Sequence, residues 1–155
     1  MVVAMIWNWC PFDALSASDL YTVLRLRQEV FVVEQDCAYL DADGSDAACY
    51  HLLGWREGVL VAYLRVFPPG TCGEHPEVVI GRVITAASAR GEGLGRTLME
   101  EGHRQSVQTW GAQPSWLSAQ AHLARFYGSL GYVVCGPGYD EDGIPHLPMR
   151  RPAAG

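Results

Sequence analysis

The chain has 155 residues, 49% of them hydrophobic and 18% charged, and its formal net charge is −6. This composition is that of a folded globular protein and excludes a generally disordered chain. The acidic balance lacks the basic footprint of a nucleic-acid-binding protein, and no apolar run approaches the ~20 residues that span a bilayer. We therefore expect one domain over residues 1–155, with neither a nucleic-acid partner nor a membrane partner.

The cysteines and the amino-terminal residues indicate a cytoplasmic protein. The five cysteines are scattered and odd in number, and they form no C-x-x-C pair, which is typical of reduced thiols. The apolar start Met1–Ile6 lacks a positively charged region, so we interpret it as a first strand and not as a signal peptide.

The first third of the chain predicts a strand, a helix and a loop. A short strand is expected at Ile6–Trp9. Ser16 then begins a helix, with Asp19 three residues later as in a capping box, and the β-branched run Val30–Val33 indicates that the helix breaks or restarts there. Residues 36–47 are expected to be a loop. Within it, Asp41-Ala42-Asp43-Gly44 resembles the start of a calcium loop, but the glycine is misplaced and no closing Glu follows, so a turn is predicted.

The rest of the chain alternates strands with helices, which predicts an α/β (α+β) domain around one central sheet. A loop rich in proline and glycine is expected at Phe67–Pro76. In chain order, the predicted elements are strands at Cys49–Trp55, Val59–Val66 and Glu77–Thr85, a helix at Gly93–Thr109, a strand at Ser115–Ala119, a helix at Ala121–Leu130, and strands at Tyr132–Cys135 and His146–Met149.

The glycine-rich segment Arg90-Gly91-Glu92-Gly93-Leu94-Gly95-Arg96 lies between a predicted strand and a predicted helix. A helix N-terminus has unpaired N–H groups and a partial positive charge, and glycines let an anion approach those groups. Arg90 and Arg96 add positive charge. The segment therefore predicts a phosphate-binding loop.

Three other interpretations of this segment compete with that one. A Rossmann loop has the pattern G-x-G-x-x-G early in a βαβ unit, whereas here the pattern is G-x-G-x-G and lies late in the chain. A Walker loop needs Gly-Lys-Ser/Thr, and the segment has no lysine. The third possibility is a glycine-rich turn that binds no ligand.

Several motifs together resemble the GNAT superfamily of N-acetyltransferases. The spacing R-x-x-G-x-G is similar to its pyrophosphate loop, and Phe126-Tyr127 followed by Gly131-Tyr132 is similar to its second signature. Further segments resemble the ElaA-like subgroup, so that the resemblance runs from Leu20 to Arg151: these are residues 27–35, 118–122 and 139–146. One departure is Ala87, which stands where many relatives have proline before the loop.

The resemblance implies a GNAT-type fold, a central mixed and mostly antiparallel sheet flanked by helices, with acetyl-CoA as co-substrate. The backbone of Val83 and Thr85 should pair with the pantetheine arm, and the amides of residues 90–96 should hold the pyrophosphate. Gln120 stands where many relatives have an Asn that contacts the cofactor. Tyr127 stands where relatives place a general acid near the CoA sulfur, so it is assigned both cofactor-binding and catalytic roles.

The implied activity is transfer of an acetyl group to a primary amine, which must first lose a proton. Glu34 is our candidate for the carboxylate that accepts this proton, although an ordinary exposed acid is the competing interpretation. His122 and His146 are candidates for proton relay. Two acidic segments, Glu34–Asp36 and Asp140–Asp142 in the loop before the final strand, are expected to border the acceptor side and, if they converge there, to attract a cationic amine. The acceptor is expected to be a small amine, a polyamine, a lysine or a protein N-terminus, and the protein a possible homodimer.

No metal site is expected, because Cys72 and His75 offer two ligands where zinc needs three or four. A non-catalytic acyl-CoA sensor stays open as an alternative function. Arg27 with Val30-Phe31 is also similar to acyl-homoserine-lactone synthases, but the further acidic and aromatic positions of those enzymes have no identified match in this chain.

Overall fold

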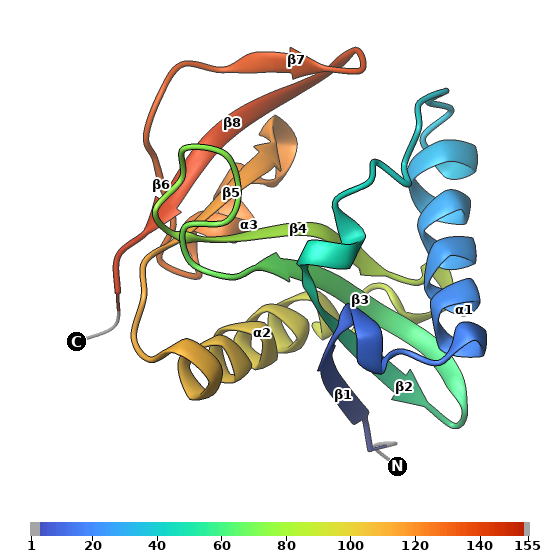
Figure 1. Cartoon of the computed structure of the whole chain (residues 1–155). Coiled ribbons are helices and arrows are strands. Elements are labelled where there is room, and N and C mark those ends of the chain that lie inside the picture. The colour runs from blue at the N-terminus through green and yellow to red at the C-terminus, as the bar shows by residue number, and fades with distance from the viewer. Residues whose placement is uncertain (1–3, 154–155) are drawn as a thin grey trace.

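The computed structural model describes residues 4–153, so Met1–Val3 of the predicted first strand lie outside the described residues (Figure 1). The strands are β1 (Ile6–Pro11), β2 (Tyr50–Arg56), β3 (Val59–Phe67), β4 (Val78–Thr85), β5 (Ser115–Gln120), β6 (Val133–Val134), β7 (Tyr139–Glu141) and β8 (Ile144–Arg151). The helices are α1 (Ala17–Arg27), α2 (Leu94–Trp110) and α3 (Ala124–Gly128), with a π-helical segment η2 (Gln28–Glu34) and 3₁₀ turns η1 (Phe12–Ala14), η3 (Asp46–Ala48), η4 (Ala87–Ala89) and η5 (Ala121–Leu123).

The eight strands form one sheet in the order β1-β2-β3-β4-β5-β8-β6, with β7 paired to β8. The pairing of β4 with β5 is parallel, and the other described pairings are antiparallel. The prediction of a mixed, mostly antiparallel sheet flanked by helices is therefore confirmed.

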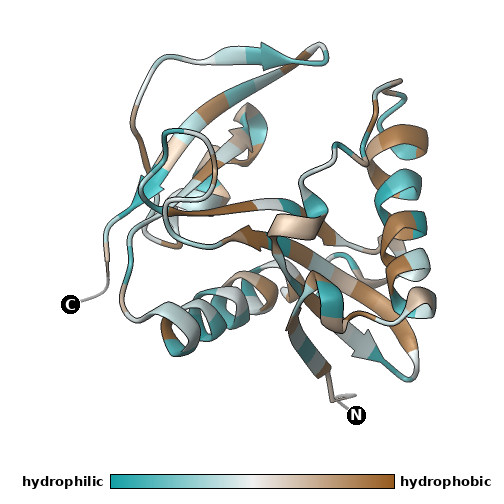
Figure 2. Cartoon of the chain, viewed as in Figure 1, coloured by the Kyte–Doolittle hydropathy of each residue, from teal (hydrophilic) through white to brown (hydrophobic). Residues whose placement is uncertain are grey.

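Helices cover both faces of the sheet, and the apolar side chains of the strands fall into two clusters, one on each face. Figure 2 shows long hydrophobic stretches along β3 and β4 in the middle of the sheet. Helix α1 packs Val23 and Leu26 against Tyr63 of β3 on one face. On the other face, α2 and α3 pack against the opposite side chains of the same strands, among them Leu64 and Leu117. Among residues 4–153, no helix is both long and apolar enough to cross a membrane.

Local sequence signals predicted most of the helices and strands correctly, but they overestimated the length of the shortest ones. Ser16 caps α1 as predicted, since its Oγ accepts from the Asp19 amide at 3.0 Å. The helix does not break at the β-branched run but continues as η2. The helix predicted at Ala121–Leu130 is only the turn η5 followed by α3, and the strand predicted at Tyr132–Cys135 is only β6.

Strands β4 and β5 separate soon after they meet, and this separation creates the opening on which the site is built. Their register pairs Val78 with Ser115 and Val79 with Trp116, and no further. Figure 1 shows the two strands diverging beyond that point. A bulge between Tyr63 and Arg65 lies in the pairing of β3 with β4, and Arg82 on β4 there has a φ of 53°. The facing edges of β4 and β5 therefore leave backbone groups unpaired.

Candidate active site

The glycine-rich loop lies between the end of β4 and the first turn of α2. Gly93 is the N-cap of α2 with a φ of 74°, and no side chain caps this helix end. Within residues 4–153, no oxygen accepts a hydrogen bond from the amides of residues 91–96. Because a helix N-terminus with free amides attracts anions, this loop can bind a phosphate group.

The backbone conformation of the glycines and the empty space around them both suit a phosphate-binding loop. Gly91 and Gly93 have φ values of 84° and 74°, a region that side chains other than glycine rarely adopt. A Cβ built on either residue would meet nothing within 4 Å, so the amides border open space. Gly95 is different, because its Cβ would lie 3.6 Å from the Phe126 ring, which places α3 directly against the start of α2.

Both arginines of the loop hold neighbouring segments in place. Arg90 donates from Nη1 to Glu34 at 2.7 Å and from Nε to the carbonyl oxygen of Thr85 at 3.2 Å. Arg96 donates to the carbonyl oxygen of Ser129 at 3.2 Å, after the end of α3. The structure thus joins Glu34, our candidate for the proton-accepting carboxylate, to an arginine assigned to the phosphate loop.

The end of β4 presents backbone groups to the opening. Ala86 donates its amide to Val61 of β3 at 2.8 Å. Because successive residues of a strand alternate their hydrogen-bonding direction, the amides of Thr85 and Val83 point away from β3. Both residues therefore offer amides to the space between β4 and β5, where Gln120 ends β5.

Tyr127 lies on α3 beneath this opening, with 6% of its surface exposed. Burial raises the pKa of its hydroxyl to about 12, so the hydroxyl keeps its proton at neutral pH. Burial is the sole cause of this shift, and no hydrogen bond within residues 4–153 contributes to it. A protonated, uncommitted donor of this kind can give a proton to a leaving group.

The two acidic segments expected on the acceptor side do approach each other. Gln120 donates to Gln35 Oε1 at 3.4 Å, and Cys37 Sγ lies 3.5 Å from the carbonyl oxygen of Asp142. The turn after η2 therefore contacts both the end of β5 and the tip of the β7–β8 hairpin. His122 is exposed in η5, whereas His146 is 8% exposed on β8.

The hairpin corrects our prediction for Asp140–Asp142, which we expected in a loop. Asp140 and Glu141 lie in β7, paired with Pro145 and Ile144 of β8. Asp142 and Gly143 form the two-residue turn, with φ values of 50° and 81°. An Asp-Gly pair between two strands is a strong signal for such a turn, and it was available in the sequence.

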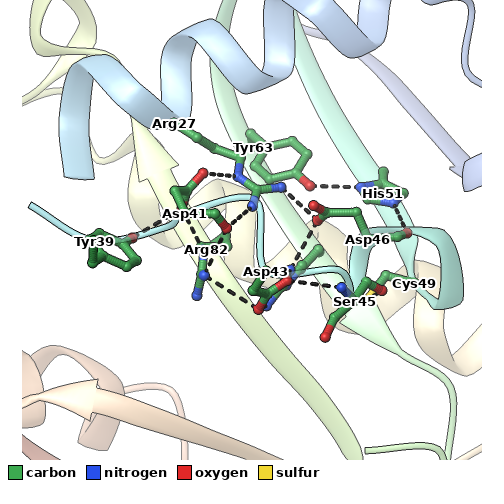
Figure 3. Close-up of polar contacts among 11 residues, drawn as sticks. Arg27, Tyr39, Asp41, Asp43, Ser45, Asp46, Cys49, His51, Tyr63 and Arg82 are labelled. Atoms are coloured by element: carbon green, nitrogen blue, oxygen red, sulfur yellow. Dashed lines mark hydrogen bonds and ion pairs between the residues drawn. The ribbon is translucent and has the colours of Figure 1, made fainter. Parts of the chain in front are cut away.

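A buried ion network underneath the acceptor side was missed by the sequence analysis (Figure 3). Arg27 donates to Asp41 at 2.8 Å and to Asp46 at 2.6 Å, with only 1% of the arginine side chain exposed. The other members are Arg65, Arg82 and Asp43, with Tyr39, Tyr63 and His51 at the periphery. Segment 36–48 is therefore not a free loop but is fixed to α1, β3 and β4.

The aspartates of this network explain the pattern that resembled a calcium loop. Hydrogen bonds from Arg65 outweigh the effect of burial and hold the pKa of Asp43 well below its usual value. Burial by itself would raise the pKa of Asp46, but the bonds from Arg27 and Arg65 lower it. Three aspartates thus face three arginines. Among residues 4–153, no group of three or more His, Cys, Asp or Glu side chains could hold a metal ion.

Comparisons with known proteins agree with this geometry. The acetyltransferase (GNAT) domain family matches residues 30–152. Protein ElaA of Escherichia coli is 44% identical over 147 residues, which is 94% of this chain and 95% of ElaA. Its crystal structure superposes with a TM-score of 0.87, covering 96% of this chain and 99% of that one.

Two further solved structures are similar to the chain. A crystal structure of an acyl-CoA N-acyltransferase from Pseudomonas aeruginosa has a TM-score of 0.90 and 45% identity, covering 96% of this chain and 99% of that one. An aminoglycoside 6′-N-acetyltransferase complexed with coenzyme A shares the fold alone, with a TM-score of 0.68, 15% identity, and coverage of 94% and 96%. The chain therefore belongs to the GNAT family and its ElaA-like group, and it is an acyltransferase.

Proposed function

We propose that the protein transfers the acetyl group of acetyl-CoA to a primary amine by direct attack of the amine on the thioester. The observation that carries this proposal is the row of free amides at residues 91–96, placed at the mouth of the opening between β4 and β5. An anion at those amides and an extended chain in the opening together match a pyrophosphate joined to a pantetheine arm.

Different residues around the opening bind different parts of acetyl-CoA. The amides of residues 91–96 bind the pyrophosphate, and the side chain of Arg96 adds charge. The backbone of Val83 and Thr85 pairs with the amide groups of the pantetheine arm. Gln120 borders the same opening from β5 and contacts that arm.

The chemistry requires few groups. The amine nitrogen attacks the carbonyl carbon, and an amide of the β4 edge stabilises the oxyanion that forms. When the carbon–sulfur bond breaks, the Tyr127 hydroxyl donates its proton to the departing thiolate and then regains one from solvent. The proton that leaves the amine must pass to a base on the acceptor side.

The acceptor side is acidic and favours a cationic amine. Glu34 and Asp142 are both exposed and belong to the two segments that meet at Cys37. His122 and His146 border the same region and serve as acceptor-side contacts. A small amine, a polyamine, a lysine side chain or a protein N-terminus suits this surface. A location in the cytoplasm suits the enzyme, because acetyl-CoA is supplied there.

The loop assignment can be tested with two matched glycine variants. Gly93 and Gly70 have the same φ of 74°, and a Cβ at either would meet nothing within 4 Å. Gly70 lies before β4 and Gly93 after it, at opposite ends of the strand. Gly93→Glu and Gly70→Glu therefore introduce the same charge and similar backbone strain, but only the first lies at the proposed phosphate site.

Isothermal calorimetry with coenzyme A measures the outcome. Loss of one or two hydrogen bonds to a charged phosphate, each ~1.5–3 kcal/mol, predicts a Kd raised by at least about 10-fold in Gly93→Glu. Gly70→Glu should bind as the wild type does. Equal affinity in both variants would remove the loop from the proposal. Tight binding of acetyl-CoA without thiol release, across a panel of amines, would favour the non-catalytic sensor instead.

A further inference from the structure

A polar cluster joins three strands on the face of the sheet that carries α1. Ser118 of β5 contacts the Tyr139 hydroxyl and donates to Glu141 Oε1 at 3.4 Å, although Tyr139 and Glu141 lie on β7. The other carboxylate oxygen, Glu141 Oε2, lies 3.4 Å from His146 Nε2 on β8. The Glu141 side chain therefore reaches back across β8 as far as β5.

This cluster lies beside the opening, on the side opposite Tyr127. Leu117 and Ala119 of β5 belong to the core beneath α2 and α3, as Tyr127 does. Because side chains alternate along a strand, Ser118 faces the other side of the sheet. Beyond Trp116, the edge of β5 has no pairing with β4. The carboxylate at Ser118 thus borders the opening from the acceptor side.

The hydrogen bonds of His146 determine which ring nitrogen carries a proton. His146 Nδ1 lies 2.7 Å from the carbonyl oxygen of Ile144, and a carbonyl can only accept, so Nδ1 carries the hydrogen. In the neutral ring, Nε2 then presents a lone pair toward the Glu141 carboxylate. A proton placed between these two acceptors would be held by both, so the pair is arranged to receive one proton.

The surroundings keep this pair in position and leave it accessible. The Tyr139 ring stacks on the His146 ring, with centroids 6.2 Å apart. Half of the Glu141 side chain is exposed, and among residues 4–153 no arginine pairs with it. Glu34, by contrast, has its carboxylate engaged 2.7 Å from Arg90. The other polar groups facing the pair come from β5, namely Ser118 and Gln120, which is in register with His146.

We propose that Glu141 is the base that removes the proton from the acceptor amine, with His146 as the residue that positions it and shares the proton. This inference rests on the acetyl transfer proposed above. As the nitrogen–carbon bond forms, the nitrogen–hydrogen bond breaks and its proton passes to the Glu141–His146 pair, which later releases it to solvent. Tyr139 and His146 also line an open depression of about 350 Å³ together with Asp140, and it offers room for the amine-bearing molecule next to Glu141.

The test compares Glu141→Gln with Glu57→Gln in the full chain. Glu57 is exposed in the turn between β2 and β3, so the same loss of charge is made there outside the proposed site. Thiol release from acetyl-CoA is followed with spermidine and with Nα-acetyl-lysine as probe amines across a pH series. Coenzyme A affinity is measured separately by calorimetry.

At neutral pH, kcat/KM for the amine should fall about 100-fold in Glu141→Gln, the low end of what a general base contributes. The loss should shrink as the pH rises toward the pKa of the amine, ~10, because free amine then needs no base. Glu141→Asp should recover part of the rate, and His146→Gln should show a smaller loss with the same pH trend. Glu57→Gln should keep the wild-type activity, and all variants should bind coenzyme A as the wild type does.

Two kinds of failure are distinguishable. If the wild type acetylates a probe and Glu141→Gln keeps its full rate, or loses rate equally at every pH, Glu141 is not the base and the proposed function stands. If the wild type binds no coenzyme A, or acetylates neither probe, the proposed acetyl transfer fails and this inference fails with it.

Discussion

The buried ion network predicts an unusually large effect for a single change of charge, Asp46→Asn. One carboxylate oxygen, Asp46 Oδ1, accepts from Arg27 at 2.6 Å and from Arg65 at 3.0 Å (Figure 3). The side chains of those arginines are only 1% and 5% exposed. Asparagine keeps the shape of aspartate but removes the charge, which leaves three arginines facing two aspartates.

The size of the effect follows from the contacts that remain. Two hydrogen bonds between charged groups are worth ~1.5–3 kcal/mol each, and breaking a buried ion pair costs ~3–5 kcal/mol. Arg27 keeps Asp41, and Arg65 keeps Asp43, so neither arginine loses every partner. We therefore expect the low end, a loss of about 3 kcal/mol in the free energy of unfolding.

The pH dependence of this contribution has a definite sign. The pKa of Asp46 is lowered from 3.8 on folding, so its stabilisation is fully present above that value. As the pH falls below 3.8 through the lower folded value, the folded protein takes up the proton and the stabilisation disappears. The difference between wild type and Asp46→Asn should therefore narrow in acid and stay constant from pH 5 to pH 7.

Urea unfolding at neutral pH measures the loss, with Asp13→Asn as the control. Asp13 is exposed in η1, and substitutions at such positions change stability by less than about 0.5 kcal/mol. Because buried charges are poorly screened, about 0.5 M salt should leave the difference nearly unchanged. A loss below about 1 kcal/mol, or one abolished by salt, would refute the assignment of a buried and energetically coupled network.

Three further outcomes are expected. Tyr127→Phe should lower kcat about 100-fold while coenzyme A affinity, measured by calorimetry, stays unchanged, because only the proton donor is lost. Burial, with a contribution from Arg151, lowers the pKa of His103 to about 4 from 6.5. The stabilisation by neutral His103 is fully present above pH 6.5 and is lost as the pH falls toward 4. The free energy of unfolding, measured with urea, should therefore be about 2 kcal/mol lower at pH 5 than above pH 6.5, and His103→Gln should abolish this pH dependence. Glu34→Gln and Asp142→Asn should each raise KM for a cationic amine, and unchanged kinetics at low salt would remove the charge argument.

The glycine-rich loop that we propose for the cofactor was predictable because its signal is local. A glycine loop after a strand and before a helix fixes both the free amides and the positive φ values, whatever the rest of the chain does. Gly91 and Gly93 behave as that pattern predicts. The sheet was predictable for a similar reason, since β2 to β4 are short runs rich in apolar and β-branched residues, a signal that each strand contains by itself.

The acceptor half was not predictable, because it depends on pairings between distant residues. Arg27 and Asp46 are 19 residues apart, and nothing near either residue indicates the other. The sequence around Asp41, Asp43 and Asp46 has the composition of a solvated turn, and only the ion pairs with arginines of α1, β3 and β4 bury these side chains. Ser118 and Glu141 likewise meet only because β7 folds back along β8.

A purely apolar core would avoid the cost of burying these ion pairs, so their placement requires a reason other than stability alone. Arg82 provides one. It occupies the bulge of β4 with a φ of 53°, a conformation that costs about 1 kcal/mol or more outside glycine, and Asp41 holds its guanidinium at 2.8 Å. Val83 follows directly, so the direction of its amide depends on this bulge. The ion network that fixes segment 36–48 therefore also fixes the edge of β4 that borders the opening, the edge to which we assign the pantetheine arm.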